Sequence, residues 1–418
     1  MQVTTRLLIF LAILGLARPG WADEVPDPGR LRLADVERLV VERNRALVGA
    51  RRATQAAEAG MDAAAARPNP IVSLNTSGIG TKRSAGSGNL DTVLRIDQPI
   101  ERGGKRQLRL AVADSLLEAS HADENDALRQ QRLLARQAYF DLKAAEDKAR
   151  LAAESARLAH EVLAKAELRQ RAGDLSPVDV ARIRTDALKA DGDARQAQVD
   201  RQRARLTLAQ LLALEAEAPR LATADPWPRL DPLPAAEPDL SQRPDVAAAS
   251  RRLEAARTGI DLAKSLRVRD VTVGAQVERD NSTETRAGNM VGFGVSIPLF
   301  TGYDYRGEIR RAHVDRDAAA DDLERLKATA AAEVVQAAFE ANELSERARR
   351  LQDEALPAAR KTSAAVQFAF TQGAASVLDV IDARRSLHVV ETDTANALAD
   401  AAKARAAWAA ALNRSELP

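Results

Sequence analysis

The sequence GDLSPVDV at residues 173–180 returns as GAASVLDV at residues 373–380, an offset of 200 residues. Earlier positions repeat at an offset of 199, as in the pairs Gly60 and Gly259, Pro99 and Pro298, Gly103 and Gly302. The repeat therefore stays in register with one inserted residue. A period this long is not that of a solenoid. It predicts a duplicated half-protein whose two halves fold alike around a pseudo-symmetry axis.

Composition narrows the class of protein. The chain has 418 residues, a formal net charge of +1 and only 3% aromatic residues. A charge near zero gives no global field for binding nucleic acid. Abundant alanine, with long stretches that lack proline and glycine, is typical of long and closely packed helices. The sequence has no cysteine, so no disulfide is expected.

The first residues have the pattern of a signal peptide. Arg6 is the positive start, residues 7–16 are an apolar run too short to span a bilayer, and residues 20–22 are a small-residue cleavage site. The alternative is a buried N-terminal helix. We expect a signal peptide at 1–22, a first structural repeat at 23–218, a proline-rich connector at 219–242 and a second structural repeat at 243–418.

Each repeat is expected to contain a shorter helix, two strands and a long helical hairpin. Residues 105–171 lack proline and glycine, which predicts one helix about 100 Å long at about 1.5 Å per residue. In the second repeat, Pro357 is expected to kink the matching helix. The other helices are expected at 33–67, 178–217, 243–266, 305–371 and 376–413.

The two return helices carry small and apolar residues at 4-3-4-3 spacing, which predicts a coiled-coil seam. The first set is Ile183, Ala187, Ala190, Ala194, Ala197, Arg201, Ala204, Leu208 and Leu211. The second set is Ala383, Leu387, Val390, Thr394, Ala397, Ala401, Ala404, Trp408 and Ala411.

Period-two alternation of side chains predicts four strands, at 71–78, 90–97, 268–278 and 290–297. Their length suits a tilted crossing of a bilayer. Four strands cannot close a transmembrane barrel, and open edges are not tolerated in lipid. If these strands span a membrane, several chains must contribute to one barrel. The alternative is a small soluble sheet or two hairpins.

These features resemble the TolC-type outer membrane factors of efflux and secretion systems, over essentially the whole chain after the signal peptide. The most specific elements are the two Gly-x-x-Ser-x-x-Asp-Val turns. ARPNP at 66–70 and QPIERGGKR at 98–106 resemble the branch that serves cobalt–zinc–cadmium-type metal efflux pumps, whereas IPLFTG at 297–302 resembles the general family.

The resemblance implies a mainly α fold with a transmembrane β-barrel. Three chains of four strands would form a 12-stranded barrel in the outer membrane, and the helical hairpins would form a periplasmic tunnel. It implies a homotrimer that contacts outer membrane lipid, a periplasmic adaptor protein and an inner-membrane pump of the RND type. No cofactor and no nucleic acid are implied.

The resemblance also suggests a periplasmic gate formed by Asp379 and Asp382, with Asp179 at the equivalent place in the first half. Threefold repetition would ring the pore with carboxylates, which attracts cations and raises carboxylate pKa values by mutual repulsion. The alternative is that these acids favour helix N-termini through the macrodipole. The family's cross-hairpin lock uses an Arg and a Tyr where this chain has Ala375 and Phe370.

The hairpin tips are expected to dock the adaptor. Gly173 and Gly373 should supply positive φ, and Ser176, followed by Pro177, and Ser376 should cap the return helices. The plain alternative is two ordinary helix–helix turns. Aromatic residues at the corner after the fourth strand fit a membrane-edge belt, or else ordinary core aromatics: Phe300, Tyr303 and Tyr305.

No catalytic or metal-binding pattern is found. None of the four histidines has a His or Cys partner at metal-ligand spacing, and no nucleophile turn or dinucleotide fingerprint occurs. The missing catalytic patterns argue against an enzyme, and the resemblance implies a passive export duct for heavy-metal cations. The alternatives are a duct for multidrug efflux or type I protein secretion, and a soluble periplasmic coiled-coil scaffold. The histidines are His121, His160, His313 and His388.

Overall fold

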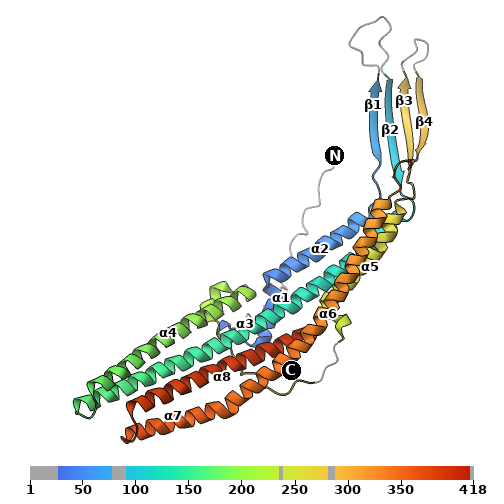
Figure 1. The fold of residues 1–418 in the computed structure, drawn as a ribbon. Coiled ribbons are helices and arrows are strands. Elements are labelled where there is room, and N and C mark those ends of the chain that lie inside the picture. The colour runs from blue at the N-terminus through green and yellow to red at the C-terminus, as the bar shows by residue number, and fades with distance from the viewer. Residues whose placement is uncertain (1–26, 78–90, 235–238, 281–287, 415–418) are drawn as a thin grey trace, which may run out of the picture.

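The protein is a long helical wall that ends in a sheet (Figure 1). The computed structural model describes residues 27–77, 91–234, 239–280 and 288–414. The predicted signal peptide at 1–22 and the Gly/Ser-rich loop near residue 85 lie outside these residues. Within them, no helix is both long and apolar enough to cross a membrane.

Helices of the two repeats run alongside one another. The first repeat contains α1 (Leu33–Arg43), α2 (Arg45–Ala65), α3 (Lys105–Arg171) and α4 (Pro177–Leu212). The second contains α5 (Pro244–Ser265), α6 (Arg306–Arg350), a π-helical turn (Leu351–Ala355), α7 (Leu356–Thr371) and α8 (Val377–Ala411). Short 3-10 turns lie at Pro28–Arg30, Glu215–Arg220 and Leu240–Gln242. Near the sheet the wall consists of α2, α3, α5 and α6, and near the far end of α4, α3, α8 and α7 (Figure 1).

The predicted 100 Å helix is confirmed. α3 contains 67 residues without interruption. It contacts α2 and α5 in one half of its length and α4 and α8 in the other, so it joins the two repeats. All predicted seam residues of α4 and α8 are partly or fully buried. Ala187 and Ala401 are fully buried, as expected where small residues let helices approach closely.

The single helix predicted at 33–67 was wrong, because Asn44 divides it. The Asn44 side chain accepts hydrogen bonds from the N–H groups of Ala46 and Leu47, so it caps α2. It also donates to Leu211 O at 3.0 Å and to Gln131 Oε1 at 3.1 Å. Asn44 is 4% exposed and thus ties the α1–α2 break to α3 and α4.

The kink predicted at Pro357 corresponds to a local interruption of the helix next to that residue. The helix is interrupted one turn earlier, by the π-helical turn Leu351–Ala355, and α7 then begins at Leu356. Pro357 lies in the first turn of α7, where a missing N–H is tolerated.

The four predicted strands form one antiparallel sheet in the order β1-β2-β3-β4. The strands are β1 (Ile71–Ser77), β2 (Asp91–Ile100), β3 (Val271–Asp280) and β4 (Gly288–Ser296). β2 continues three residues beyond its predicted end, through Pro99, which lies opposite Thr272. The first and second repeats therefore meet at the β2–β3 pair.

A core around Tyr139 holds the N-terminal segment and the connector against α3. Tyr139 is fully buried, and its hydroxyl lies 3.2 Å from both Leu31 O and Asp225 Oδ2. Burial raises the pKa of the Tyr139 phenol, so it remains neutral. The apolar residues around it come from α1, α3, α4 and the segment after α4: Val36, Leu39, Leu142, Leu208, Leu212 and Leu221.

Candidate functional site: two hairpin tips and an apolar sheet

The two hairpin tips have the same backbone geometry. Gly173 and Gly373 have φ values of +83° and +77°, which confirms the predicted left-handed conformation. Asp174 N donates to Arg169 O at 2.9 Å, and Ala374 N donates to Ala369 O at 2.8 Å. These bonds satisfy the last carbonyls of α3 and α7. Glycine fits because a Cβ would be strained there.

The predicted caps are also present. Ser176 Oγ accepts from Asp179 N at 3.1 Å, and Ser376 Oγ accepts from Asp379 N at 3.2 Å. Pro177 occupies the first position of α4, where its missing N–H costs nothing. Each return helix therefore begins directly after its capping serine, α4 at Pro177 and α8 at Val377.

The acids of the two tips differ in their partners. The Asp379 carboxylate accepts from Ser376 N at 2.9 Å and from Ser376 Oγ at 2.7 Å. These bonds lower the pKa of Asp379 within one chain. Asp382 is exposed and has no ion pair within the described residues. In the first tip, Arg182 lies 3.5 Å from Asp179 and offsets its charge.

Apolar side chains join the two hairpins just inside the tips. One buried cluster combines Val162, Ala166, Val180 and Ile183 of the first hairpin with Phe370, Val377, Val380 and Ile381 of the second. The guanidinium of Arg169 lies 5.3 Å from the Phe370 ring centroid. Phe370 therefore links the hairpins by stacking with a cation.

Two polar contacts between the hairpins were missed by sequence reasoning. Arg385 Nη2 lies 2.9 Å from Asp186 Oδ1, and Arg384 Nη2 donates to Ser155 O at 2.7 Å. Burial lowers the pKa of Arg384, although its guanidinium stays charged near neutral pH. No motif marks these residues, because the contacts depend on how the two hairpins face each other.

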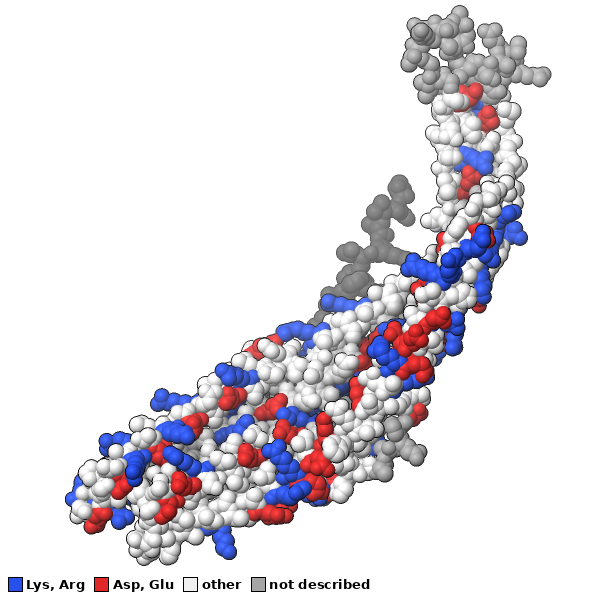
Figure 2. Space-filling view, in the orientation of Figure 1, with Lys and Arg blue, Asp and Glu red and all other residues white. Residues whose placement is uncertain are grey.

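The two faces of the sheet differ in character. Side chains from adjacent strands form rows, because the strands pair in register. One face is apolar and exposed, with Phe293 at 84%. Its other large side chains are Val72, Leu74, Leu94, Ile96, Val273, Val277, Val291 and Val295. Figure 2 shows many charges on the helical wall and few on the sheet. An exposed apolar face of this extent needs lipid or a partner.

The predicted membrane-edge aromatics lie together at the corner that follows β4. The Phe300 and Tyr305 rings are 5.2 Å apart, and the Tyr303 and Tyr305 rings are 5.9 Å apart. Tyr305 has φ of +60°, and the Tyr303 hydroxyl donates to Glu308 Oε2 at 2.7 Å. Tyr303 is half exposed, as a side chain at a polar boundary would be.

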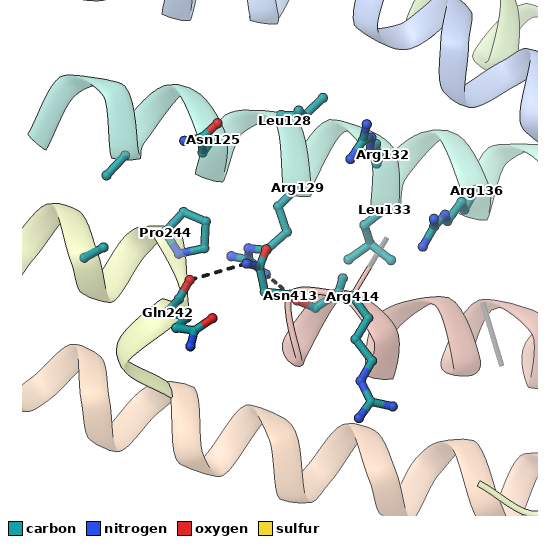
Figure 3. A pocket seen from close by; sticks show the side chains of 13 residues that line it. Asn125, Leu128, Arg129, Arg132, Leu133, Arg136, Gln242, Pro244, Asn413 and Arg414 are labelled. Atoms are coloured by element: carbon teal, nitrogen blue, oxygen red, sulfur yellow. Dashed lines mark hydrogen bonds between the residues drawn. The ribbon is translucent and has the colours of Figure 1, made fainter. Parts of the chain in front are cut away.

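A cavity of about 340 Å³ lies where α8 ends and α5 begins beside α3 (Figure 3). Arg129, Arg132, Arg136 and Arg414 line it. Asn413 Nδ2 donates to Gln242 O at 3.3 Å and Arg129 Nη1 donates to Ala410 O at 3.3 Å. These bonds join the end of α8 to the start of α5 and to α3. The cavity therefore lies where α3, the start of α5 and the end of α8 are connected.

The described residues contain no group of three or more His, Cys, Asp or Glu side chains placed to hold a metal ion. His160 Nε2 contacts the Asp191 carboxylate at 2.9 Å, as an exposed pair between α3 and α4. No metal is therefore assigned to these histidines.

A wall of long helical hairpins that ends in a sheet with an apolar outer face defines a channel subunit of the outer membrane. Residues 38–214 and 238–414 match the family described as outer membrane efflux protein, and the chain belongs to this family. Its fold is mainly helical, and the described strands of one chain form one four-stranded antiparallel sheet.

Two curated relatives and one solved structure illustrate the match. The chain is 28% identical to the cobalt-zinc-cadmium resistance protein CzcC of Cupriavidus metallidurans, over 86% of this chain and 84% of CzcC. It is 26% identical to the pyoverdine export outer membrane protein OpmQ of Pseudomonas putida, over 62% of this chain and 56% of OpmQ. The crystal structure of CusC has a TM-score of 0.78, with 20% identity and 91% of each chain covered.

Proposed function

We propose that this protein is the outer membrane duct of a tripartite efflux system that exports heavy-metal cations. It acts as a homotrimer, passively and without catalysis, and the energy comes from an inner-membrane pump of the RND type. The observation that carries the metal assignment is the similarity to CzcC, which extends over 86% of the chain. The apolar face of the sheet supports its place in lipid, with Phe300, Tyr303 and Tyr305 at the membrane edge.

The hairpin tips are the proposed docking surface for the periplasmic adaptor. Apolar side chains remain exposed at matching positions of the two tips: Leu168 and Phe368 before the turns, Val178 and Leu378 after them. The two residues of each pair are 200 positions apart, which is the offset of the repeat. Both tips therefore present exposed apolar side chains at the same positions. Exposed apolar side chains grouped around a polar turn are typical of a protein-binding surface.

Asp379 and Asp382 are the proposed acids of the periplasmic gate, with Asp179 contributing less. Asp382 is exposed and unpaired within the described residues, whereas Arg182 offsets Asp179. The contacts between Arg385 and Asp186 and between Arg169 and Phe370 hold the hairpins together where Ala375 and Phe370 replace the family's lock. Opening therefore requires these contacts between hairpins to change.

Metal sensitivity tests this function. A strain that lacks this gene should stop growing at lower concentrations of cobalt, zinc or cadmium salts, and the wild-type gene should restore growth. A double variant, Val178→Asp with Leu378→Asp, should fail to restore growth although trimer levels stay normal, because both side chains are exposed. Unchanged metal resistance in the deletion strain would refute the metal assignment.

Similarity to OpmQ favours a second candidate, export of an organic compound such as a siderophore. The same deletion strain separates the two functions. Normal metal tolerance together with loss of siderophore secretion would favour the second candidate.

A further inference from the structure

The face of the sheet opposite the apolar one carries a charged network on a floor of glycine. The register places Ser73, Arg95, Gln276 and Gly292 in one row, and Asp97, Gly274 and Gly294 in the next row on the same face. Ile71 lies beside Asp97 on this face, and a further row nearer its outer end contains Asn75, Val93, Glu278 and Met290. If the apolar face meets lipid, this face lines the lumen of the barrel.

Arg95 lies across neighbouring strands. Its Nε donates to Asp97 Oδ2 at 2.7 Å, and its Nη1 donates to Gln276 Oε1 at 3.2 Å. The side chain of Arg95 is 31% exposed and that of Asp97 is 20% exposed. A guanidinium that projected into a wide lumen would be far more exposed. Arg95 therefore lies flat on the wall.

Glycines make room for this flat arrangement. A Cβ at Gly274 would overlap Asp97 Oδ1 and lie 2.8 Å from Arg95 Nη2. At Gly294 it would lie 3.3 Å from the same Nη2, and at Gly292 it would lie 3.1 Å from Gln276 Cγ. None of the three glycines has a positive φ. Their common role is space for the side chains that cross above them.

We propose that Arg95 and Asp97, held flat by Gly274 and Gly294, determine the width and the charge selectivity of the outer membrane end of the channel. This inference rests on the proposed trimer, in which three such pairs would surround the lumen. Three unpaired guanidiniums would oppose the passage of metal cations. Asp97 cancels the charge of Arg95, and the glycine floor keeps both side chains out of the path.

Charged thiol reagents test this proposal without depending on the periplasmic gate. The sequence has no cysteine, so a single Ser73→Cys change, opposite Arg95, provides one label site. Cationic and anionic methanethiosulfonates would be added outside cells, and the ratio of their labelling rates reports the local potential. Adding Asp97→Asn should lower the cationic-to-anionic ratio by about threefold or more. Arg95→Gln should raise that ratio, and it serves as a second variant if Asp97→Asn does not assemble.

A matched pair of neighbouring substitutions tests the role of the glycine floor. Gly274→Val should slow both reagents at Ser73→Cys, because Arg95 and Asp97 must move into the lumen. Ala275→Val, on the opposite face of the same strand, should leave both rates unchanged. An unchanged ratio in Asp97→Asn and Arg95→Gln, or equal rates in Gly274→Val and Ala275→Val, would overturn the proposal.

A further control separates this inference from the proposed function. Val72→Cys, one residue from Ser73 on the apolar face, should be protected from both reagents by lipid. If Val72→Cys and Ser73→Cys label equally, the placement of the sheet in a barrel is wrong. If Val72→Cys is protected but the charge variants have no effect, only the role of Arg95 and Asp97 is wrong.

Discussion

The two long helical spans of the protein connect equivalent landmarks with different numbers of residues. Gly173 follows Gly103 by 70 positions, whereas Gly373 follows Gly302 by 71. The first span is the uninterrupted helix α3, and the second contains the π-helical turn Leu351–Ala355 between α6 and α7. A π turn of this kind is an α-helix that has gained one residue. The helical part of the second span is nevertheless one residue shorter than α3, because α6 begins at Arg306, four positions after Gly302, whereas α3 begins at Lys105, two positions after Gly103. The extra residue of the second span therefore lies in the corner before α6, and the π turn is a separate widening of the helix.

This difference gives the two hairpins different mechanical properties. α3 has a continuous ladder of hydrogen bonds, while the second hairpin has a wider turn followed directly by Pro357. A local break of this type is where a long helix bends. We therefore expect the second hairpin to move more readily than the first. The second tip carries Asp382, which has no ion pair in the part of the chain that the structure describes.

Single-residue deletions should produce the largest difference between the spans. Deleting the exposed Ala153 from α3 rotates all later residues by about 100° relative to those before it, so the packing of α3 on α4 and α8 is lost. Deleting the exposed Gln352 from the π-helical turn restores an α-helix and preserves register. Trimer yield after detergent extraction should collapse for the first deletion and remain close to wild type for the second. Equal loss of trimer in both would show that the π turn cannot lose a residue without disturbing the packing.

Removal of a capping serine should lower local stability at its own tip, by a similar amount in the two tips. This effect should be smaller than that of the deletion in α3. Ser176→Ala and Ser376→Ala each remove the hydroxyl that accepts from the third residue of a return helix. Each change should lower the local free energy of opening by about 1 kcal/mol. Hydrogen exchange measured by mass spectrometry would report faster exchange in the first turn of α4 or α8 alone. Exchange that rises at both tips in each variant would contradict independent caps.

Acidification should have the smallest of these effects, a local loosening of the second tip. The pKa of Asp379 is lowered in the folded tip by its bonds to Ser376, from an ordinary value of 3.8. This stabilisation is therefore present above that value and is lost as the pH falls through the folded pKa. A spin label on Ala375→Cys should become more mobile below about pH 4. In Asp379→Asn the label should be mobile at every pH, and a label whose mobility does not respond to pH would argue against the cap.

Much of the fold follows from local signals in the sequence. The absence of proline and glycine defines α3, the Gly and Ser positions define the tips, and period-two alternation defines both faces of the sheet. These features could be predicted because each depends on residues that are close in sequence. The division at Asn44 could not, because its side chain is fixed by Gln131 and Leu211 from other helices.

The site could be predicted only in part for the same reason. The capping role of Ser376 and the position of Asp379 follow from the turn motif. The contact of Arg385 with Asp186 could not be predicted, because it depends on two return helices lying side by side. The glycine floor of Gly274 and Gly294 beneath Arg95 could not be predicted either, because it depends on how three strands pair. The sequence offset revealed that a residue was inserted, but only the structure shows that α6 begins later after Gly302 than α3 begins after Gly103.

The conductance of the purified trimer in planar bilayers tests the central claim, that the second tip forms the constriction of an outer membrane duct. Asp379→Asn with Asp382→Asn should enlarge the single-channel conductance and weaken block by divalent cations. Ser376→Ala, which opens the same cap but keeps both carboxylates, should retain that block. Conductance and block that are unchanged in the double variant would contradict the assignment of the gate to these acids.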